Sequence, residues 1–118
     1  MKENNKVDVE ELKKSIVEGE DMERCIGLYY FLNYTNEYII KHAYEILQLD
    51  KDFYELSRSY AITVIGQQGT RKDIPVLMEE YLDIEGKYSK DEENYLNSLL
   101  PKRHVMDSIE MINYHTML

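Results

Sequence analysis

The sequence predicts an all-helical protein, and three observations carry this prediction. The 118 residues include only five glycines and two prolines, so few positions interrupt regular structure. No segment shows the strict alternation of apolar and polar residues that an amphipathic strand requires. Apolar residues instead recur three, four and seven positions apart, which is the spacing of one face of an α-helix. We therefore expect helices joined by short turns.

Each expected helix is defined by a stripe of apolar residues along one of its faces. None of these helices is apolar all round, so each stripe needs a neighbouring helix to cover it. In chain order, the seven stripes consist of Val9, Leu12, Ile16 and Val17; of Met22, Ile26, Tyr29, Tyr30 and Phe31; of Ile39, Ala43, Ile46 and Leu47; of Phe53, Leu56, Tyr60, Ala61, Val64 and Ile65; of Ile74, Leu77, Met78, Tyr81 and Leu82; of Tyr95, Leu96, Leu99 and Leu100; and of Ile109, Ile112, Thr116 and Met117.

Glycine and proline mark where these helices should begin and end. Gly19 follows the first stripe, and Gly66 and Gly69 follow the fourth. Glycine adopts the left-handed backbone that ends many helices, and we expect Gly69 to adopt it. Pro75 lies in the first turn of the fifth helix, where a proline is well tolerated. Pro101 is expected to end the sixth helix before the seventh begins.

The fourth and fifth stripes form the clearest repeat unit, and weaker copies of it precede and follow. A shift of 34 residues superposes Arg58 on Arg24. A shift of 35 residues superposes the helix that starts near Ile74 on the helix that starts near Ile39. The same shift in the other direction reaches the helix around Ile109. Self-similarity at such a period is typical of stacked helical repeats.

The central unit has a characteristic set of residues, which comprises Arg58, Ala61, Ile65-Gly66, Gly69, Ile74-Pro75, Leu77, Leu82 and Asp83. This set resembles a HEAT-like repeat of the short kind found in phycobilisome-lyase-type proteins. The resemblance implies a short right-handed α-solenoid of antiparallel helix pairs, with the second helix of each pair on the concave face. We therefore expect a single domain with an N-terminal capping helix at 7–18 and helical pairs at 21–48, 52–84 and 90–118. The openings typical of tetratricopeptide and ankyrin repeats are absent.

Composition limits the partners. Asp and Glu outnumber Lys and Arg by 23 to 14, which gives a formal net charge of −9. Nucleic acids and anionic membranes attract basic surfaces, so we expect neither as a partner. The longest apolar run, 26–32, is far shorter than the roughly 20 residues that span a bilayer. The N-terminal residues do not read as a secretion signal. We expect a soluble, cytoplasmic protein.

No motif for catalysis, nucleotide binding or metal binding occurs in the sequence. The three histidines, His42, His104 and His115, have no spacing that would bring them together. His42 falls on an apolar face and is expected in the core, whereas His104 is expected in a loop and His115 on an outward position. The single cysteine, Cys25, is expected to be a buried thiol. We therefore expect no catalytic residue, no metal and no cofactor.

The eleven tyrosines are the most informative feature of the composition. We expect Tyr30, Tyr60 and Tyr81 in the core with their hydroxyls at its edge. Overlaying the second helices of the repeats identifies side chains that point away from the apolar stripes. Those of the central helix are acidic, and those of the helices on either side include tyrosines. Tyrosine buries a large area with little loss of entropy, so it is favoured in protein interfaces. We predict one exposed, concave surface that binds a basic protein partner, formed by Tyr44, Glu45, Glu79, Glu80, Asp83, Tyr114 and His115.

These expectations favour a non-catalytic protein-binding module. A small acidic helical protein is also similar to bacterial toxin-immunity proteins, some of which have helical-repeat folds and block a basic nuclease toxin. Charge attraction would give such a protein fast capture of a cationic partner. Two alternatives stay open, which are a lyase or enzyme-accessory protein, as the phycobilisome-type resemblance suggests, and a general scaffold or adaptor.

Overall fold

The computed structural model describes residues 8–35, 37–49, 56–88 and 92–116, with the backbone alone at 87–88 and 92–98. All regular structure in these ranges is helical, which confirms the predicted fold class. The elements are α1 (Val9–Glu18), α2 (Asp21–Tyr34), α3 (Ile40–Leu47), α4 (Leu56–Gln68), the 3-10 helix η2 (Arg71–Asp73), α5 (Ile74–Tyr88) and α6 (Glu92–Thr116).

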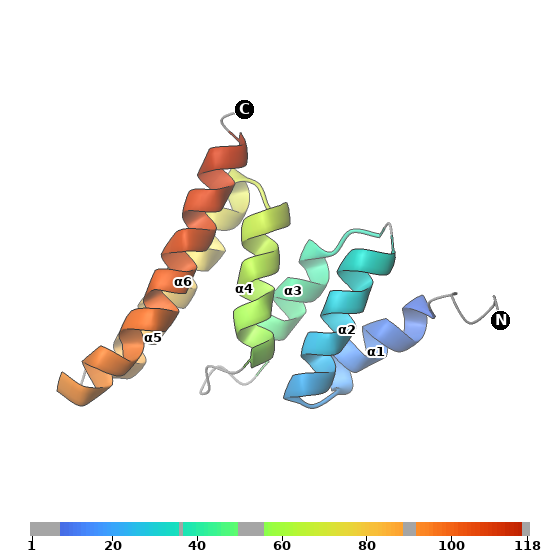
Figure 1. Ribbon diagram of the computed structural model, residues 1–118, viewed down its shortest axis with the longest axis horizontal. Helices are drawn as coiled ribbons and strands as arrows, with labels where there is room; N and C mark the ends of the chain where they lie inside the picture. Colours follow the sequence, from blue (N-terminus) through green and yellow to red (C-terminus); the bar gives the residue numbers. More distant parts are fainter. Residues whose placement is uncertain (1–7, 36, 50–55, 89–91, 117–118) are drawn as a thin grey trace.

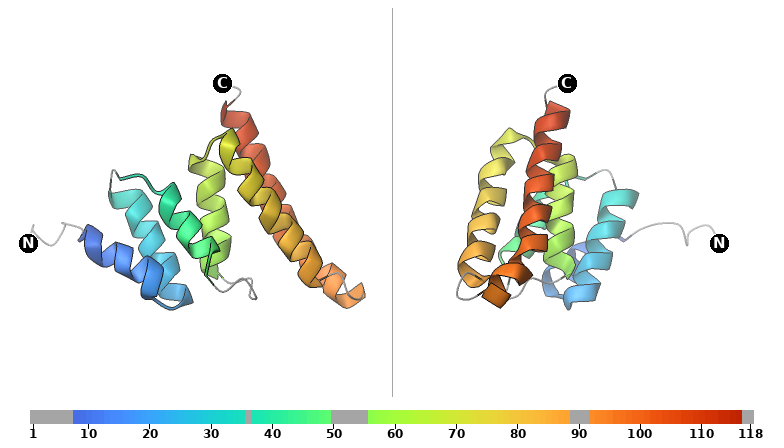
Figure 2. Two further views of the ribbon diagram at one scale, coloured as in Figure 1. Left: turned by 180° about the vertical axis from the view of Figure 1, so that it is seen from behind. Right: turned by 60° about the vertical axis from the view of Figure 1, so that its left-hand side comes forward.

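The helices lie in two layers. Helices α2, α4 and α6 form the layer at the front of Figure 1. Helices α1, α3 and α5 form the other layer, which comes forward when the molecule is seen from behind (Figure 2). Helix α1 packs against α2, α3 against α4, and α5 against α6, while α4 also packs between α2 and α6. The helices thus bury apolar residues against their neighbours in the other layer and in their own.

The helices that pack most closely are not the expected pairs, because the pairing is shifted by one helix along the chain. We expected α2 to pair with α3 and α4 with α5, but within the described ranges α2 packs mainly on α1 and α4, and α4 mainly on α6 and α3. Two buried glycines explain the difference, because they let backbones approach closely. A Cβ atom at Gly27 would lie 3.2 Å from Cγ1 of Ile16, and one at Gly66 would lie 2.8 Å from Cβ of Ser108. Gly66 therefore lies inside α4 at a helix contact instead of ending the helix.

The expected helix pair at 90–118 is a single helix instead. Pro101 lies inside α6, so the break predicted at this residue is wrong. A proline inside a helix removes one backbone hydrogen bond and costs about 3 kcal/mol. Val105, Ile109 and Ile112 follow the proline and are buried. Their burial against neighbouring helices offsets the local cost, which a prediction from local propensity does not include.

The core lies between the two layers. All four residues of the third stripe are buried, as expected. On α5, Leu77 and Ile84 are buried, but Met78 and Leu82, which we expected in the core, are exposed. Helix α5 is therefore rotated about its axis relative to the orientation that the sequence pattern suggested.

The backbone polar groups at helix ends form hydrogen bonds with side chains and within close turns. The carboxylate of Asp21 accepts the backbone N–H groups of Leu56 at 3.2 Å and Ser57 at 2.8 Å, so it joins the starts of α2 and α4. The N–H of Gly69 donates to the carbonyl oxygen of Ile65 at 2.8 Å and closes α4. Gly69 does not adopt a left-handed backbone, contrary to expectation. A glycine is required here because a side chain does not fit. A Cβ atom at Gly69 would lie 2.4 Å from the carbonyl oxygen of Ile65.

Candidate functional site

Glu80, expected at the centre of the partner-binding surface, is buried instead. It is 4% exposed, and its two carboxylate oxygens accept hydrogen bonds from Nη1 of Arg58 at 2.8 and 3.0 Å. Nη2 of Arg58 donates to the carbonyl oxygens of Leu47 at 3.0 Å and Leu49 at 2.6 Å. A buried carboxylate is tolerated when a hydrogen-bonded cation pairs with it. The expected exposure of Glu80 is therefore wrong, and the pair joins the end of α3 to α4 and α5.

Two members of the predicted surface lie on α3 and are engaged within the protein. Tyr44, expected to be exposed, is half-buried, and its hydroxyl donates a hydrogen bond to the carboxylate of Asp73. Burial, then this hydrogen bond and the charge of Asp73, raise the pKa of Tyr44. An oxygen of Glu45 lies 2.5 Å from Nδ1 of His42. Both side chains are therefore already engaged in contacts within the protein.

The other members of the predicted surface are divided between the two layers. Glu79 and Asp83 are exposed on α5, and Tyr114 is 71% exposed on α6. His115 is half-buried on α6, with Nε2 3.3 Å from the carbonyl oxygen of Gly66. Because α3 and α5 lie in one layer and α6 in the other, these residues do not form the single concave surface that the repeat overlay predicted.

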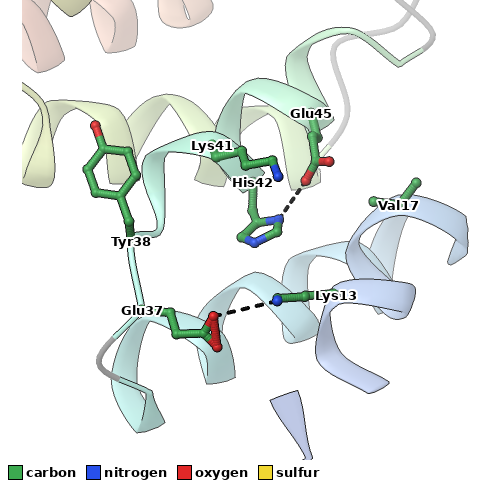
Figure 3. A pocket seen from close by; sticks show the side chains of 7 residues that line it. All are labelled: Lys13, Val17, Glu37, Tyr38, Lys41, His42 and Glu45. Carbon is green, nitrogen blue, oxygen red and sulfur yellow. Dashed lines mark hydrogen bonds and ion pairs between the residues drawn. The ribbon is translucent and has the colours of Figure 1, made fainter. Parts of the chain in front are cut away.

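A hollow of about 360 Å³ lies between α1 and α3 (Figure 3). Its two carboxylates each contact a basic side chain. Nζ of Lys13 lies 3.5 Å from an oxygen of Glu37, and His42 contacts Glu45 as described above. The described lining consists of Lys13, Val17, Glu37, Tyr38, Lys41, His42 and Glu45. No cysteine or serine that could act as a nucleophile is among these residues.

The three histidines have separate local roles. The ring of His42 is buried edge-on against Phe31, with centroids 4.6 Å apart, which confirms the predicted core position. His104 lies in α6 and not in a loop, with Nε2 3.0 Å from Oγ1 of Thr63 and 2.9 Å from the carbonyl oxygen of Ser59. In the described part of the chain, no three His, Cys, Asp or Glu side chains gather so that they could hold a metal ion.

A further candidate surface lies on α2. Its buried side consists of Gly27, Leu28 and Phe31. Its opposite side exposes a row of large apolar and aromatic residues that we call the α2 outer face. Exposed fractions along this row range from 42% at Tyr30 to 58% at Tyr34. The row consists of Met22, Ile26, Tyr29, Tyr30 and Tyr34.

The tyrosines of the α2 outer face are ordered by contacts with one another. The rings of Tyr29 and Tyr30 meet edge to face with centroids 5.5 Å apart, and those of Tyr30 and Tyr34 stack at 5.3 Å. Such ring pairs hold the side chains in defined positions. Because ordered rings lose less entropy when they are covered, this row suits a binding surface.

Sequence reasoning missed the α2 outer face because it placed this row in the core. Met22, Ile26, Tyr29 and Tyr30 have helical spacing, and we expected them to be buried together with Phe31. The signal that could have identified the face is that α2 carries large apolar residues on both of its sides. An ordinary surface helix is polar on the side that faces water.

Comparisons with family models, with curated proteins and with solved structures find no match to this chain. Among the helices that the structure describes, none combines the length and the apolar character needed to cross a membrane.

Proposed function

We propose that this protein is a non-catalytic protein-binding module that uses the α2 outer face. The observation that carries the proposal is the exposure of one methionine, one isoleucine and three tyrosines along a single helix. Exposed apolar patches of this kind mark interaction sites in soluble proteins, and tyrosine and methionine are enriched in interfaces. Covering these side chains would remove apolar area from water, which is the main driving force of association.

The partner that best fits is a basic protein. The formal net charge of −9 would attract a cationic surface over long range and accelerate its capture. Neutralisation of a basic toxin in the cytoplasm, as by an immunity protein, is the specific role that we propose. The proposed scaffold is a short HEAT-like array. The repeat pattern in the sequence and the two helical layers support this interpretation.

The experiment compares two aspartate substitutions of exposed apolar residues. Ile26→Asp places a charge in the α2 outer face, whereas Leu82→Asp places one on the exposed side of α5 as the matched control. The tagged wild type is used to capture a partner, which is then purified. The affinity of each variant for it is measured by calorimetry. We expect Ile26→Asp to weaken binding at least tenfold and Leu82→Asp to change it little. Equal affinities of wild type and Ile26→Asp would contradict the proposed face.

A further inference from the structure

Beside the α2 outer face, an acidic hollow of about 420 Å³ lies at the turn between α1 and α2. Carboxylates dominate its lining, which comprises Glu11, Lys14, Ser15, Glu18, Gly19 and Glu23. Glu23 belongs to α2 itself and lies three residues before Ile26 of the α2 outer face, so the two side chains are neighbours on the helix surface. The hollow and the apolar row are therefore neighbouring parts of one surface.

The position of Glu18 is electrostatically unfavourable in the free protein. It is the last residue of α1, and no basic residue lies in the last turn of that helix. The C-terminal end of a helix has a partial negative charge, so it favours a cation over a carboxylate. Glu20 caps the start of the next helix only two residues away, and Glu23 lies in the first turn of that helix, where its carboxylate accepts the N–H of Glu20 at 2.9 Å. No ion pair joins Lys14 to these carboxylates in the described part of the chain. A cation supplied from outside would relieve this repulsion.

We infer that the α2 outer face binds a basic amphipathic helix of the partner, with its apolar stripe on Ile26 and Tyr30 and a Lys or Arg side chain in the hollow beside Glu18. This inference rests on the proposed function and specifies the chemistry of the partner. The exposed row has helical spacing, and a row of this kind packs against the corresponding row of another helix. The fourteen residues of α2 provide about 21 Å of length, enough for a partner helix of similar length.

The negative charge of the protein favours a basic helix on the α2 outer face over a second copy of the chain and over an anionic membrane. A second copy of the chain would bring another formal net charge of −9 to this surface, so the two copies would repel each other. An anionic membrane would meet the same acidic rim. A helix that presents lysine or arginine beside its apolar stripe is the occupant that complements both the row and the hollow.

The test uses two synthetic helical peptides of about 18 residues, which corresponds to about five helical turns. Both have leucine at every third or fourth position, and the remaining positions are lysine in one peptide and glutamate in the other. Binding to the full chain is followed by backbone NMR shifts, by calorimetry and by its salt dependence. The variants are Glu18→Lys, Ile26→Asp and, as a charge-matched control on α5, Glu79→Lys. Glu18→Lys also suits the C-terminal end of α1, so it should preserve the fold.

We expect the lysine peptide to bind, the glutamate peptide not to bind, and the largest shifts to lie on α2. Glu18→Lys should weaken binding at least fivefold and reduce its salt dependence, whereas Glu79→Lys should change it less than twofold. Loss of binding in Ile26→Asp without an effect of Glu18→Lys would overturn this inference but leave the proposed function intact. Undiminished binding in Ile26→Asp would contradict both. Failure of the lysine peptide to bind, self-association of the chain through α2, or equal binding of both peptides would overturn the inference.

Discussion

The guanidinium group of Arg58 and the carboxylate of Glu80 form a buried ion pair, with Nη1 2.8 and 3.0 Å from the two carboxylate oxygens. Each side chain is 6% exposed. Arg58 also binds two carbonyl oxygens at the end of α3. One guanidinium group on α4 therefore holds the end of α3 and the middle of α5.

Glu80→Ala should destabilise the protein strongly. The substitution leaves the charge of Arg58 buried without its carboxylate, and removal of one partner of such a pair costs about 3–5 kcal/mol. Urea unfolding followed by circular dichroism measures this loss. The control is Glu79→Ala, which truncates the exposed neighbour and should change the free energy of unfolding by less than about 0.5 kcal/mol. Similar losses in both variants would show that the ion pair does not stabilise the fold.

Tyr44→Phe should make stability less sensitive to alkaline pH. Burial and the contact with Asp73 raise the pKa of Tyr44 in the folded protein, whereas an unfolded tyrosine has a pKa of about 10. The neutral hydroxyl therefore stabilises the fold fully below pH of about 10, and its contribution declines as the pH rises toward the folded pKa.

The measurement for Tyr44 is urea unfolding between pH 8 and pH 11. Over this interval the free energy of unfolding of the wild type should fall by about 1 kcal/mol more than that of Tyr44→Phe. The upper end of the interval lies about one unit above the pKa of an unfolded tyrosine, and one unit corresponds to about 1.4 kcal/mol. Tyr114→Phe, which removes an exposed hydroxyl, should follow the wild type. Parallel curves for wild type and Tyr44→Phe would mean that the contact with Asp73 does not control this ionisation.

Gly66→Ala and Gly86→Ala should have opposite effects. A Cβ atom at Gly66 would lie 2.8 Å from Cβ and 2.9 Å from Cα of Ser108, so α4 and α6 would have to separate. Overpacking of this kind costs about 1–3 kcal/mol. Apart from the local helix backbone and the chain neighbours, no atom of the described residues lies within 4 Å of a Cβ placed at Gly86, and replacing an exposed helical glycine by alanine stabilises by about 0.5–1 kcal/mol. Thermal unfolding of the two variants provides the comparison, and a stabilised Gly66→Ala would refute the close contact.

The thiol of Cys25 should react slowly with disulfide reagents near neutral pH. Burial, and secondarily the negative charge of Asp21, raise its pKa. The thiolate is the reactive form, so a raised pKa lowers the rate. Reaction with a chromogenic aromatic disulfide should be at least several-fold slower in the folded chain than after denaturation in urea. A folded thiol that reacts as fast as the denatured one would contradict this prediction.

Sequence periodicity determined that the chain is helical and where most helices lie. The apolar stripe of α3 is buried as expected, and His42 lies in the core, because both depend on spacing within one helix. The repeat relationship was less informative about contacts. Arg24 superposes on Arg58, yet its Nε atom is buried without a hydrogen-bond partner among the described residues. Glu45, the counterpart of Glu80, contacts His42 instead.

Only the tertiary structure decided which side of each helix meets the core and which helices pair. Helix α2 has large apolar residues on both sides, so its spacing identifies a helix without selecting the buried side. The buried side is the one that contains Gly27, because the absence of a side chain at this position lets α1 approach α2. Charge in the sequence predicted exposure for Glu80, but Arg58 on another helix compensates its burial. Such choices depend on contacts between residues distant in sequence, and local periodicity and polarity do not contain that information.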